Sequence, residues 1–321
     1  MTTSTTPIYV CGPLASGTTS LGISLAKEFD GEIVNADVAK AFRGLETLSA
    51  VPPEDYLSQV PHHLHSVLDP SENCDPLAFR NLALPVIEEI QSRGKCPIIV
   101  GGSGVYLKTL THGPSSLPER DDALRKGFEE RDNDDLAAEL KSLDPEGAAA
   151  TDLKNRRYLS RALEICLLSG QKMSILKAEQ FRRFDEITLS LRGLYLLWDN
   201  DNSKQRISSR TMQILEKGGV EEVKAVRETA SKTCRKIIGF SEIKDHIDSK
   251  LTLKETHKGF HTSTRRSAKR QRAWMKKGIL DRGRHLPLSF RCKGGLFPRV
   301  INRDRRISVP LVLPALNPER E

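Results

Sequence analysis

The stretch Tyr9-Val-Cys-Gly-Pro-Leu-Ala-Ser-Gly-Thr-Thr19 decides how this chain folds. Before its first glycine, the apolar run Ile8–Cys11 predicts a buried strand, and helix-forming residues follow over Leu21–Phe29. The glycines lie five residues apart and precede a threonine, as in the phosphate-binding pattern G-x-x-x-x-G-K-[ST]. Such a loop surrounds an anion with backbone N–H groups and the positive end of a helix. We therefore expect residues 12–19 to bind phosphate, and we call them the phosphate loop.

One position in the phosphate loop departs from the pattern. Thr18 stands where the pattern has lysine, whereas Thr19 fills the hydroxyl position. The loop can still bind oxygens through its backbone, but it lacks the ammonium group that normally meets the β-phosphate.

Strand-like and helix-like segments alternate along the first 112 residues. A strand over Glu32–Asn35 is followed by a helix over Leu77–Arg93, a strand over Cys96–Gly102 and a helix over Val105–Leu110. Alternation of this kind favours a parallel sheet covered by helices. Together with the phosphate loop, it predicts an α/β fold with a P-loop NTPase-like parallel sheet flanked by helices.

The pattern changes along the chain and predicts four parts. Residues 1–117 form the first part of the α/β core. Residues 118–186 lose the strand signal and place apolar residues at helical spacing, which predicts an α-helical insertion domain. Residues 187–283 return to the core and end in a basic helix, and residues 284–321 form an irregular tail.

The chain has 321 residues and a net charge of +8, and its basic residues cluster. This cluster contains Arg265, Arg266, Lys269, Arg270, Arg272, Lys276 and Lys277. It favours a polyanionic partner, either nucleic acid or a diphosphate, although a solvated helix face is the alternative. No segment approaches the roughly 18 apolar residues of a membrane span. We expect a cytoplasmic monomer without a membrane partner, and leave a mitochondrial or nuclear pool open.

Two other residue types carry weaker signals. The six cysteines include no C-x-x-C pair, so neither a disulfide framework nor a zinc site is indicated. The segment Pro61-His-His-Leu-His65 contains three histidines. Adjacent histidines point in different directions, so we expect hydrogen-bonding structural residues there and no metal site.

Several polar groups follow the predicted strands and therefore converge at the carboxyl edge of the sheet, where α/β proteins bind ligands. Asp37 could act as a general base, accept hydrogen bonds beside a metal ion, or only form a turn. Thr19 could bind Mg²⁺ or a phosphate oxygen. Arg206 and Arg210 lie one helical turn apart and could clamp a diphosphate together.

An ordered set of segments resembles the tRNA dimethylallyltransferase family, also called tRNA isopentenyltransferases. The resemblance runs over residues 7–277 and is specific as a set. It is carried by Gly12–Thr19, Asn35–Val38, Val60–Leu64, Leu68–Pro70, Gly101–Tyr106, Arg161–Glu164, Arg206–Arg210, Ile238–Phe240 and Thr264–Gln271.

The resemblance implies transfer of a dimethylallyl group from dimethylallyl diphosphate to N6 of the adenine beside the anticodon in tRNA. Asp37 would take the N6 proton, and Thr19 and Arg210 complete the expected catalytic set. Mg²⁺ is the expected cofactor, with Thr19 as its protein ligand. The diphosphate would be held by Gly12, Ala15, Ser16, Gly17, Thr18, Thr19, Arg206 and Arg210. The helical insertion and the basic helix would bind the anticodon stem-loop, the latter through Arg265, Arg266, Lys269, Arg270 and Gln271.

The departures from the family pattern gather around the expected site. Besides Thr18, the run that follows the aspartate is Val38-Ala-Lys-Ala-Phe42, where the family has Ser-x-Gln-x-Tyr. Loss of a charged donor from a diphosphate site costs about 2–4 kcal/mol of transition-state stabilisation. Lys40, at the glutamine position, offers a partial replacement. Reduced or altered activity is therefore expected.

Three hypotheses follow from these observations. The first is a prenyltransferase that acts on tRNA. The second is a diverged prenyltransferase with a small acceptor, such as an adenine nucleotide or a specialised metabolite. The third is a catalytically impaired relative that only binds RNA.

Overall fold

A computed structural model of the chain describes all residues except 1–5, 114–116, 184–191, 198–199, 276–287 and 292–321. The chain divides into two compact units. Unit 1 comprises residues 1–111 and 189–321, and unit 2 comprises residues 112–188. Within the described ranges, no helix has the length and apolar character that crossing a membrane requires.

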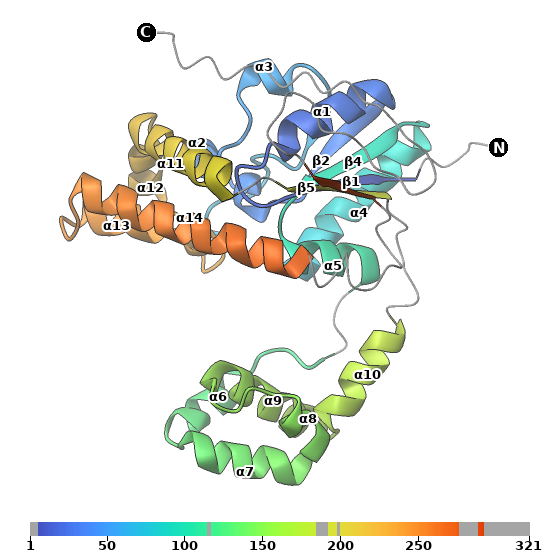
Figure 1. Cartoon of the computed structure of the whole chain (residues 1–321), viewed down its shortest axis with the longest axis vertical. Coiled ribbons are helices and arrows are strands. Elements are labelled where there is room, and N and C mark those ends of the chain that lie inside the picture. The colour runs from blue at the N-terminus through green and yellow to red at the C-terminus, as the bar shows by residue number, and fades with distance from the viewer. Residues whose placement is uncertain (1–5, 114–116, 184–191, 198–199, 276–287, 292–321) are drawn as a thin grey trace. The chain divides into compact units, whose positions relative to one another are not determined.

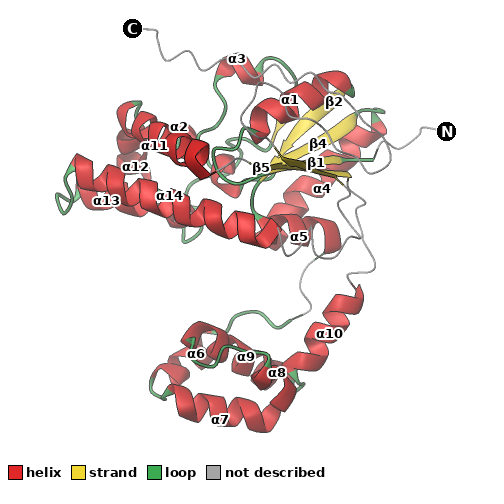
Figure 2. Cartoon of the chain, in the orientation of Figure 1, coloured by secondary structure: helices red, strands yellow, loops and turns green. Residues whose placement is uncertain are grey.

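Unit 1 is built on a six-stranded sheet in the order β3-β2-β4-β1-β5-β6, and every pair of neighbours is parallel. Figure 2 shows the sheet enclosed by helices. The prediction of an α/β fold with a parallel sheet is confirmed. The strands are β1 (Ile8–Cys11), β2 (Gly31–Asn35), β3 (His62–His63), β4 (Cys96–Gly101), β5 (Arg192–Leu197) and β6 (Leu288–Arg291).

Successive residues of the central strands pack into two different cores, because side chains alternate between the faces of a sheet. In β1, Val10 joins one apolar cluster whereas Tyr9 and Cys11 join the other. The first cluster is closed by α1 (Thr18–Glu28), and the second by helices that include α4 (Pro76–Ser92). Figure 1 shows α1 and α4 on opposite faces of the sheet. Burial of both faces explains why these strands are continuous apolar runs.

The other helices of unit 1 complete the layers around the sheet. The helices are α2 (Glu46–Ser49), α3 (Glu54–Leu57), α5 (Gly104–His112), α11 (Asn200–Glu216), α12 (Gly219–Val226), α13 (Phe240–Ile247) and α14 (Leu253–Met275), with 3-10 turns η1 (Val38–Ala41) and η2 (Cys234–Lys236). Gly218 adopts a left-handed φ of 107° and separates two of these helices, α11 and α12.

Two strands were not predicted. β3 is only two residues long and pairs with Ile33 and Val34 of β2. The expectation of an irregular tail is wrong for Leu288–Arg291, which forms β6 beside β5. The edge strand of a sheet has unpaired backbone N–H and C=O groups. A short segment beside it can pair with these groups without any sequence periodicity of its own. The rest of the predicted tail lies outside the described residues.

Unit 2 is helical, with its own apolar core that includes Leu136, Leu140 and Leu163. Its helices are α6 (Asp122–Glu129), α7 (Asn133–Leu143), α8 (Pro145–Ala149), α9 (Arg156–Ser169) and α10 (Met173–Arg183). Aspartate side chains cap α6, α7 and α8 by accepting backbone N–H groups. These caps stop one helix and start the next within a few residues.

A buried carboxylate ties unit 2 together. Glu164 is 0% exposed and accepts hydrogen bonds from Arg125, from Arg161 and from the backbone N–H of Asp121. Burial alone raises the pKa of Glu164, but these hydrogen bonds outweigh it and lower the pKa from 4.5 to about 2. The ionised form is therefore the one that the fold stabilises.

We predict that Glu164→Ala destabilises unit 2 by about 3 kcal/mol at pH 7, because it leaves two arginines without their buried partner. The measurement is thermal unfolding by calorimetry. The stabilisation by Glu164 is present above pH 4.5 and is lost as the pH falls towards 2. The difference in melting temperature between the variant and the wild type should therefore shrink at pH 3. Glu129→Ala, at an exposed position of α6, is the control. Equal melting of Glu164→Ala and the wild type at pH 7 would refute the prediction.

Candidate active site

The phosphate loop connects β1 to α1 and has a backbone that depends on its glycines. A Cβ atom on Gly12 would lie 2.3 Å from Ser16 Oγ, and Gly17 adopts a left-handed φ of 87°. Ala15 is also left-handed, with φ 63°. Because α1 begins at Thr18, the N–H groups of its first turn have no partner within the helix. Together with the helix dipole, these groups provide the expected anion site.

The end of α14 packs against the phosphate loop and against the glycine turn after β4. Gln271 Oε1 accepts a hydrogen bond from the backbone N–H of Leu14 at 2.9 Å. A Cβ atom on Gly102 would lie 2.8 Å from Gln271 Nε2, and one on Gly104 would lie 2.1 Å from the Trp274 ring. Gln271 was predicted to bind RNA, but its amide is turned towards the loop.

Arg206 and Arg210 extend from α11 to the same region, as their spacing predicted. Arg206 Nε donates to the carbonyl of Ala15 at 2.8 Å, and Arg210 Nη2 donates to the carbonyl of Ser49 at 3.4 Å. Burial lowers the pKa of both guanidinium groups. Arginine pKa values start so far above neutrality that both side chains stay charged. Arg206 therefore lies on the loop itself, and Arg210 lies one turn further along the helix.

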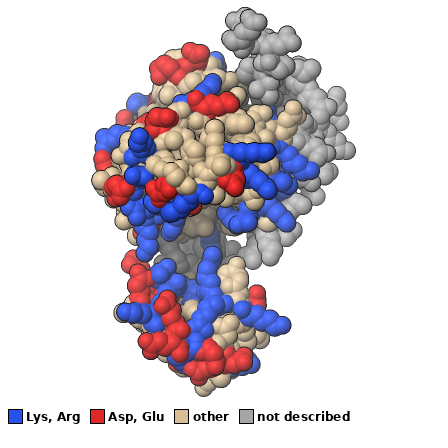
Figure 3. Space-filling model, turned by 90° about the vertical axis from the view of Figure 1, so that its left-hand side faces the viewer, with Lys and Arg blue, Asp and Glu red and all other residues tan. Residues whose placement is uncertain are grey.

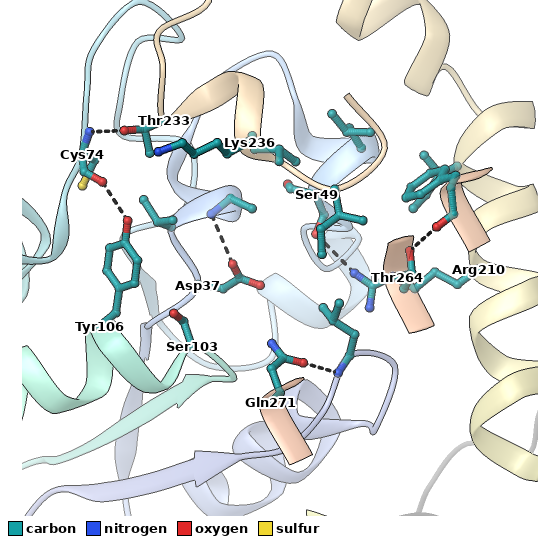
Figure 4. Close-up of a pocket in the computed structure, with 18 of the residues that line it drawn as sticks. Asp37, Ser49, Cys74, Ser103, Tyr106, Arg210, Thr233, Lys236, Thr264 and Gln271 are labelled. Atoms are coloured by element: carbon teal, nitrogen blue, oxygen red, sulfur yellow. Dashed lines mark hydrogen bonds between the residues drawn. The ribbon is translucent and has the colours of Figure 1, made fainter. Parts of the chain in front are cut away.

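Asp37 follows β2, and its position is compatible with two of its expected roles, turn former and general base. Its Oδ1 accepts from the backbone N–H of Ala39 at 3.2 Å and caps η1, so it is a turn former. Asn35 holds the backbone of Asp37 through two hydrogen bonds. Figure 4 shows the Asp37 carboxylate inside the pocket, between Tyr106, Gln271 and Arg210. It is therefore also placed to accept a proton from a bound molecule.

The pocket of unit 1 that contains Asp37 has a volume of about 400 Å³. Its polar groups come from the ends of β2 and β4 and from α11 and α14, and its apolar wall includes Ile214, Ile237 and Phe260. Such a combination suits a ligand with a hydrocarbon part and a polar part. Residues of the lining that the sequence did not indicate as site residues include Leu48, Ser49, Cys74, Ser103, Tyr106, Thr233 and Lys236.

Lys40 lies on η1, three residues after Asp37, and has an altered pKa. Burial lowers the pKa of its amino group from 10.5 to about 8; the charge of Asp37 opposes this shift, and the charge of Arg210 adds to it. Burial lowers the pKa of His62 to about 4 and of His65 to about 3, and the charge of Lys40 adds a smaller shift in the same direction. Both imidazoles are therefore neutral at pH 7.

The histidine segment Pro61–His65 agrees only in part with the prediction of hydrogen-bonding structural histidines. His63 Nε2 forms a 2.7 Å contact with Glu32 and behaves as a structural residue. The Nδ1 atom of His65 is buried and has no hydrogen-bond partner among the residues that the structure describes. No group of three or more histidine, cysteine, aspartate or glutamate side chains in the described ranges could hold a metal ion. The five described cysteines are buried and free.

One face of α14 is basic and exposed. Arg265, Arg266, Lys269 and Arg270 are exposed, whereas Thr264 and Ala268 on the other face are buried. Figure 3 views the side of the molecule that carries α11–α14, and shows lysine and arginine side chains in a band across unit 1 with acidic residues interspersed. Lys276 and Lys277, the end of the predicted cluster, lie outside the described residues.

We predict that Gln271→Leu weakens the binding of inorganic diphosphate by about 1–3 kcal/mol, because the Leu14 N–H loses its acceptor and the loop loses a support. Calorimetric titration with diphosphate measures this loss. Gln213→Leu makes the same change at an exposed position of α11 and should bind normally. Unchanged diphosphate binding together with weakened RNA binding would instead make Gln271 an RNA contact.

Comparisons with known proteins identify the family. A family model described as IPP transferase matches residues 40–278. A tRNA dimethylallyltransferase of Akkermansia muciniphila is 34% identical over 270 residues, which are 84% of this chain and 90% of that protein. The crystal structure of a tRNA isopentenylpyrophosphate transferase from Bacillus halodurans is similar, with TM-score 0.61 and 30% identity over 85% of this chain and 88% of that one. The structure of a eukaryotic dimethylallyltransferase acting on tRNA is also similar, with TM-score 0.71 and 27% identity over 90% of this chain and 74% of that one. The chain belongs to the IPP transferase family.

Proposed function

We propose that this protein transfers a dimethylallyl group from dimethylallyl diphosphate to N6 of the adenine beside the anticodon in tRNA. The observation that carries the proposal is the position of the Asp37 carboxylate in a pocket with an apolar wall, which the half-buried Arg210 and Leu14 of the phosphate loop also line. The names of the relatives, tRNA dimethylallyltransferases of about the same length, support it.

The proposed reaction uses these groups as follows. The bond between C1 of the dimethylallyl group and the diphosphate oxygen breaks, and a bond from C1 to the adenine N6 forms. Asp37 takes the proton from N6. The diphosphate leaves with developing negative charge, which the loop N–H groups, Arg206 and Arg210 stabilise. Because the adenine must reach a pocket inside unit 1, it has to leave its stack in the anticodon loop.

We also propose a cofactor, a cellular location, an oligomeric state and a tRNA-binding surface. Mg²⁺ is commonly held by one or two protein oxygens together with substrate phosphates and water. The hydroxyl of Thr19 fits that role, and the bound ion would offset charge on the diphosphate. We further propose a cytoplasmic monomer whose activity is altered by Thr18. The basic face of α14 and unit 2 would bind the tRNA.

The central experiment incubates the purified protein with labelled dimethylallyl diphosphate and tRNAs that carry adenines after the anticodon. Label should appear on N6 of the adenine beside the anticodon, and mass spectrometry of the digested nucleosides measures it. Transfer that survives complete RNase treatment would show a small acceptor instead. Absence of transfer to any acceptor would leave an RNA-binding relative and defeat the proposal.

We predict that Asp37→Asn lowers the rate of transfer by about 10²–10⁴-fold, because an amide cannot take the N6 proton. Asparagine can still accept the hydrogen bond from Ala39 N–H, so η1 and donor binding should persist. Single-turnover kinetics with saturating donor measures the rate. Asp55→Asn, at an exposed position of α3, should transfer normally. A rate for Asp37→Asn within the error of the wild type would remove Asp37 from the mechanism.

We also predict that alanine at Arg265, Arg266, Lys269 and Arg270 weakens tRNA binding and leaves donor binding unchanged. Each lost phosphate contact should lower the slope of log affinity against log salt by about one. Filter binding over a series of salt concentrations measures the slope. The control replaces Lys254 and Lys258, exposed lysines at the start of the same helix. An equal effect in both variants would indicate general charge attraction rather than a defined contact surface.

A further inference from the structure

We propose that Glu222 is a positioning residue of the site, which holds the short helix α2 in place and thereby fixes the guanidinium group of Arg210 in the pocket. This inference rests on the proposed function, in which Arg210 stabilises the departing diphosphate. Glu222 lies on α12 and is not among the residues that line the pocket. Its effect on the reaction would pass through α2.

The first step is the contact between Glu222 and the start of α2. One carboxylate oxygen accepts the backbone N–H of Thr47 at 2.7 Å, and the other accepts the backbone N–H of Leu48 at 2.8 Å. The first N–H groups of a helix have no partner within it, and the residue before α2, Leu45, supplies no side-chain cap. A helix of four residues is too short to be stable alone. The half-buried carboxylate of Glu222, 175 residues after Thr47, therefore acts as the cap of α2.

The second step is the part that α2 contributes to the pocket. Its last two residues, Leu48 and Ser49, are buried and belong to the pocket lining. The carbonyl of Ser49 accepts the hydrogen bond that Arg210 Nη2 donates (Figure 4). Figure 1 shows α2 beside α11 and α12. The helix α2 thus contacts both the helix that carries Glu222 and the helix that carries Arg210.

The third step is the length of the hydrogen bond between α2 and Arg210. The distance from Arg210 Nη2 to the Ser49 carbonyl oxygen is 3.4 Å, which is longer than the usual range of roughly 2.7–3.2 Å. A small shift of α2 would therefore break this bond and release the guanidinium group from its position beside Asp37. Misplacement of a catalytic group by about 1 Å can lower a rate about 10²-fold. The two short hydrogen bonds of Glu222 prevent such a shift.

An alternative role for Glu222 is stability alone. Loss of a helix cap lowers the melting temperature, whether or not the capped helix belongs to a site. The two roles differ in how the loss of Glu222 combines with the loss of Arg210. If Glu222 acts through Arg210, a variant without Arg210 has no guanidinium group left to misplace. If Glu222 only stabilises the fold, its loss has the same effect with and without Arg210.

The experiment is a double-mutant cycle of Glu222→Ala and Arg210→Ala, in which kcat and KM for transfer and the melting temperature are measured. We expect Glu222→Ala to lower kcat by about 10²-fold, with a smaller change in KM for dimethylallyl diphosphate. In the Arg210→Ala background, the same substitution should change kcat by less than about twofold. Glu222→Gln keeps one oxygen as an acceptor, so its kcat should lie between those of Glu222→Ala and the wild type. Glu221→Ala, at the exposed neighbouring position of α12, is the matched control.

Two results of this cycle would overturn the inference. The first is a kcat of Glu222→Ala equal to that of the wild type. The second is an equal loss in both backgrounds, because it would indicate a role in stability alone. If Glu222→Ala does not fold, the cycle is measured with Glu222→Gln and the same two results decide.

Failure of the proposed function has a different signature, which is a wild type that transfers to no acceptor. The same cycle is then measured as the affinity for inorganic diphosphate, by calorimetric titration. A loss of affinity in Glu222→Ala that disappears in the Arg210→Ala background would support the role of Glu222. Equal losses in both backgrounds, or no loss, would overturn it.

Discussion

The contact between the last turns of α14 and two glycine turns is the constraint on which the site depends. Gln271 accepts the Leu14 N–H, and its side chain occupies the space that a Cβ atom on Gly102 would need. Trp274 fills the equivalent space at Gly104. Residues more than 250 positions apart in the chain are thereby held together at the carboxyl edge of the sheet. The exposed face of the same helix is basic, so one helix supports the phosphate loop and presents a surface for a polyanion.

The site is also organised by an excess of positive charge. Arg206 and Arg210 are half-buried on α11, and the charge of the Asp37 carboxylate acts on Arg210. Burial raises the free energy of each charged side chain in the protein without a ligand. A bound anion lowers this free energy again. A binding site that is unfavourable when empty favours strong discrimination between charged and neutral ligands. The apolar wall then accepts a hydrocarbon group next to the anion.

Features that neighbouring residues determine could be predicted from the sequence, whereas features that depend on partners far along the chain could not. The phosphate loop, the strand before it and the helix after it follow from glycine spacing and apolar periodicity, and the structure has them where the sequence placed them. The positions of Asp37, Arg206 and Arg210 follow from strand ends and helical spacing. The contact of Gln271 with the phosphate loop could not be predicted, because its neighbours in sequence are exposed arginines and its partner Leu14 lies 257 positions away. The strands β3 and β6 carry no periodic signal, since their pairing partners define them.

The phosphate loop keeps the features that its backbone requires. It lies before residues 40–278, the region that the family model matches and that contains Arg206, Arg210 and α14. The loop binds mainly through backbone N–H groups, which every residue type except proline can supply. What it needs from its sequence is the left-handed turn at Gly17 and the lack of a side chain at Gly12. Replacement of the lysine by Thr18 leaves both features intact. The loop therefore keeps the backbone geometry of an anion site although it lacks the ammonium group of the pattern.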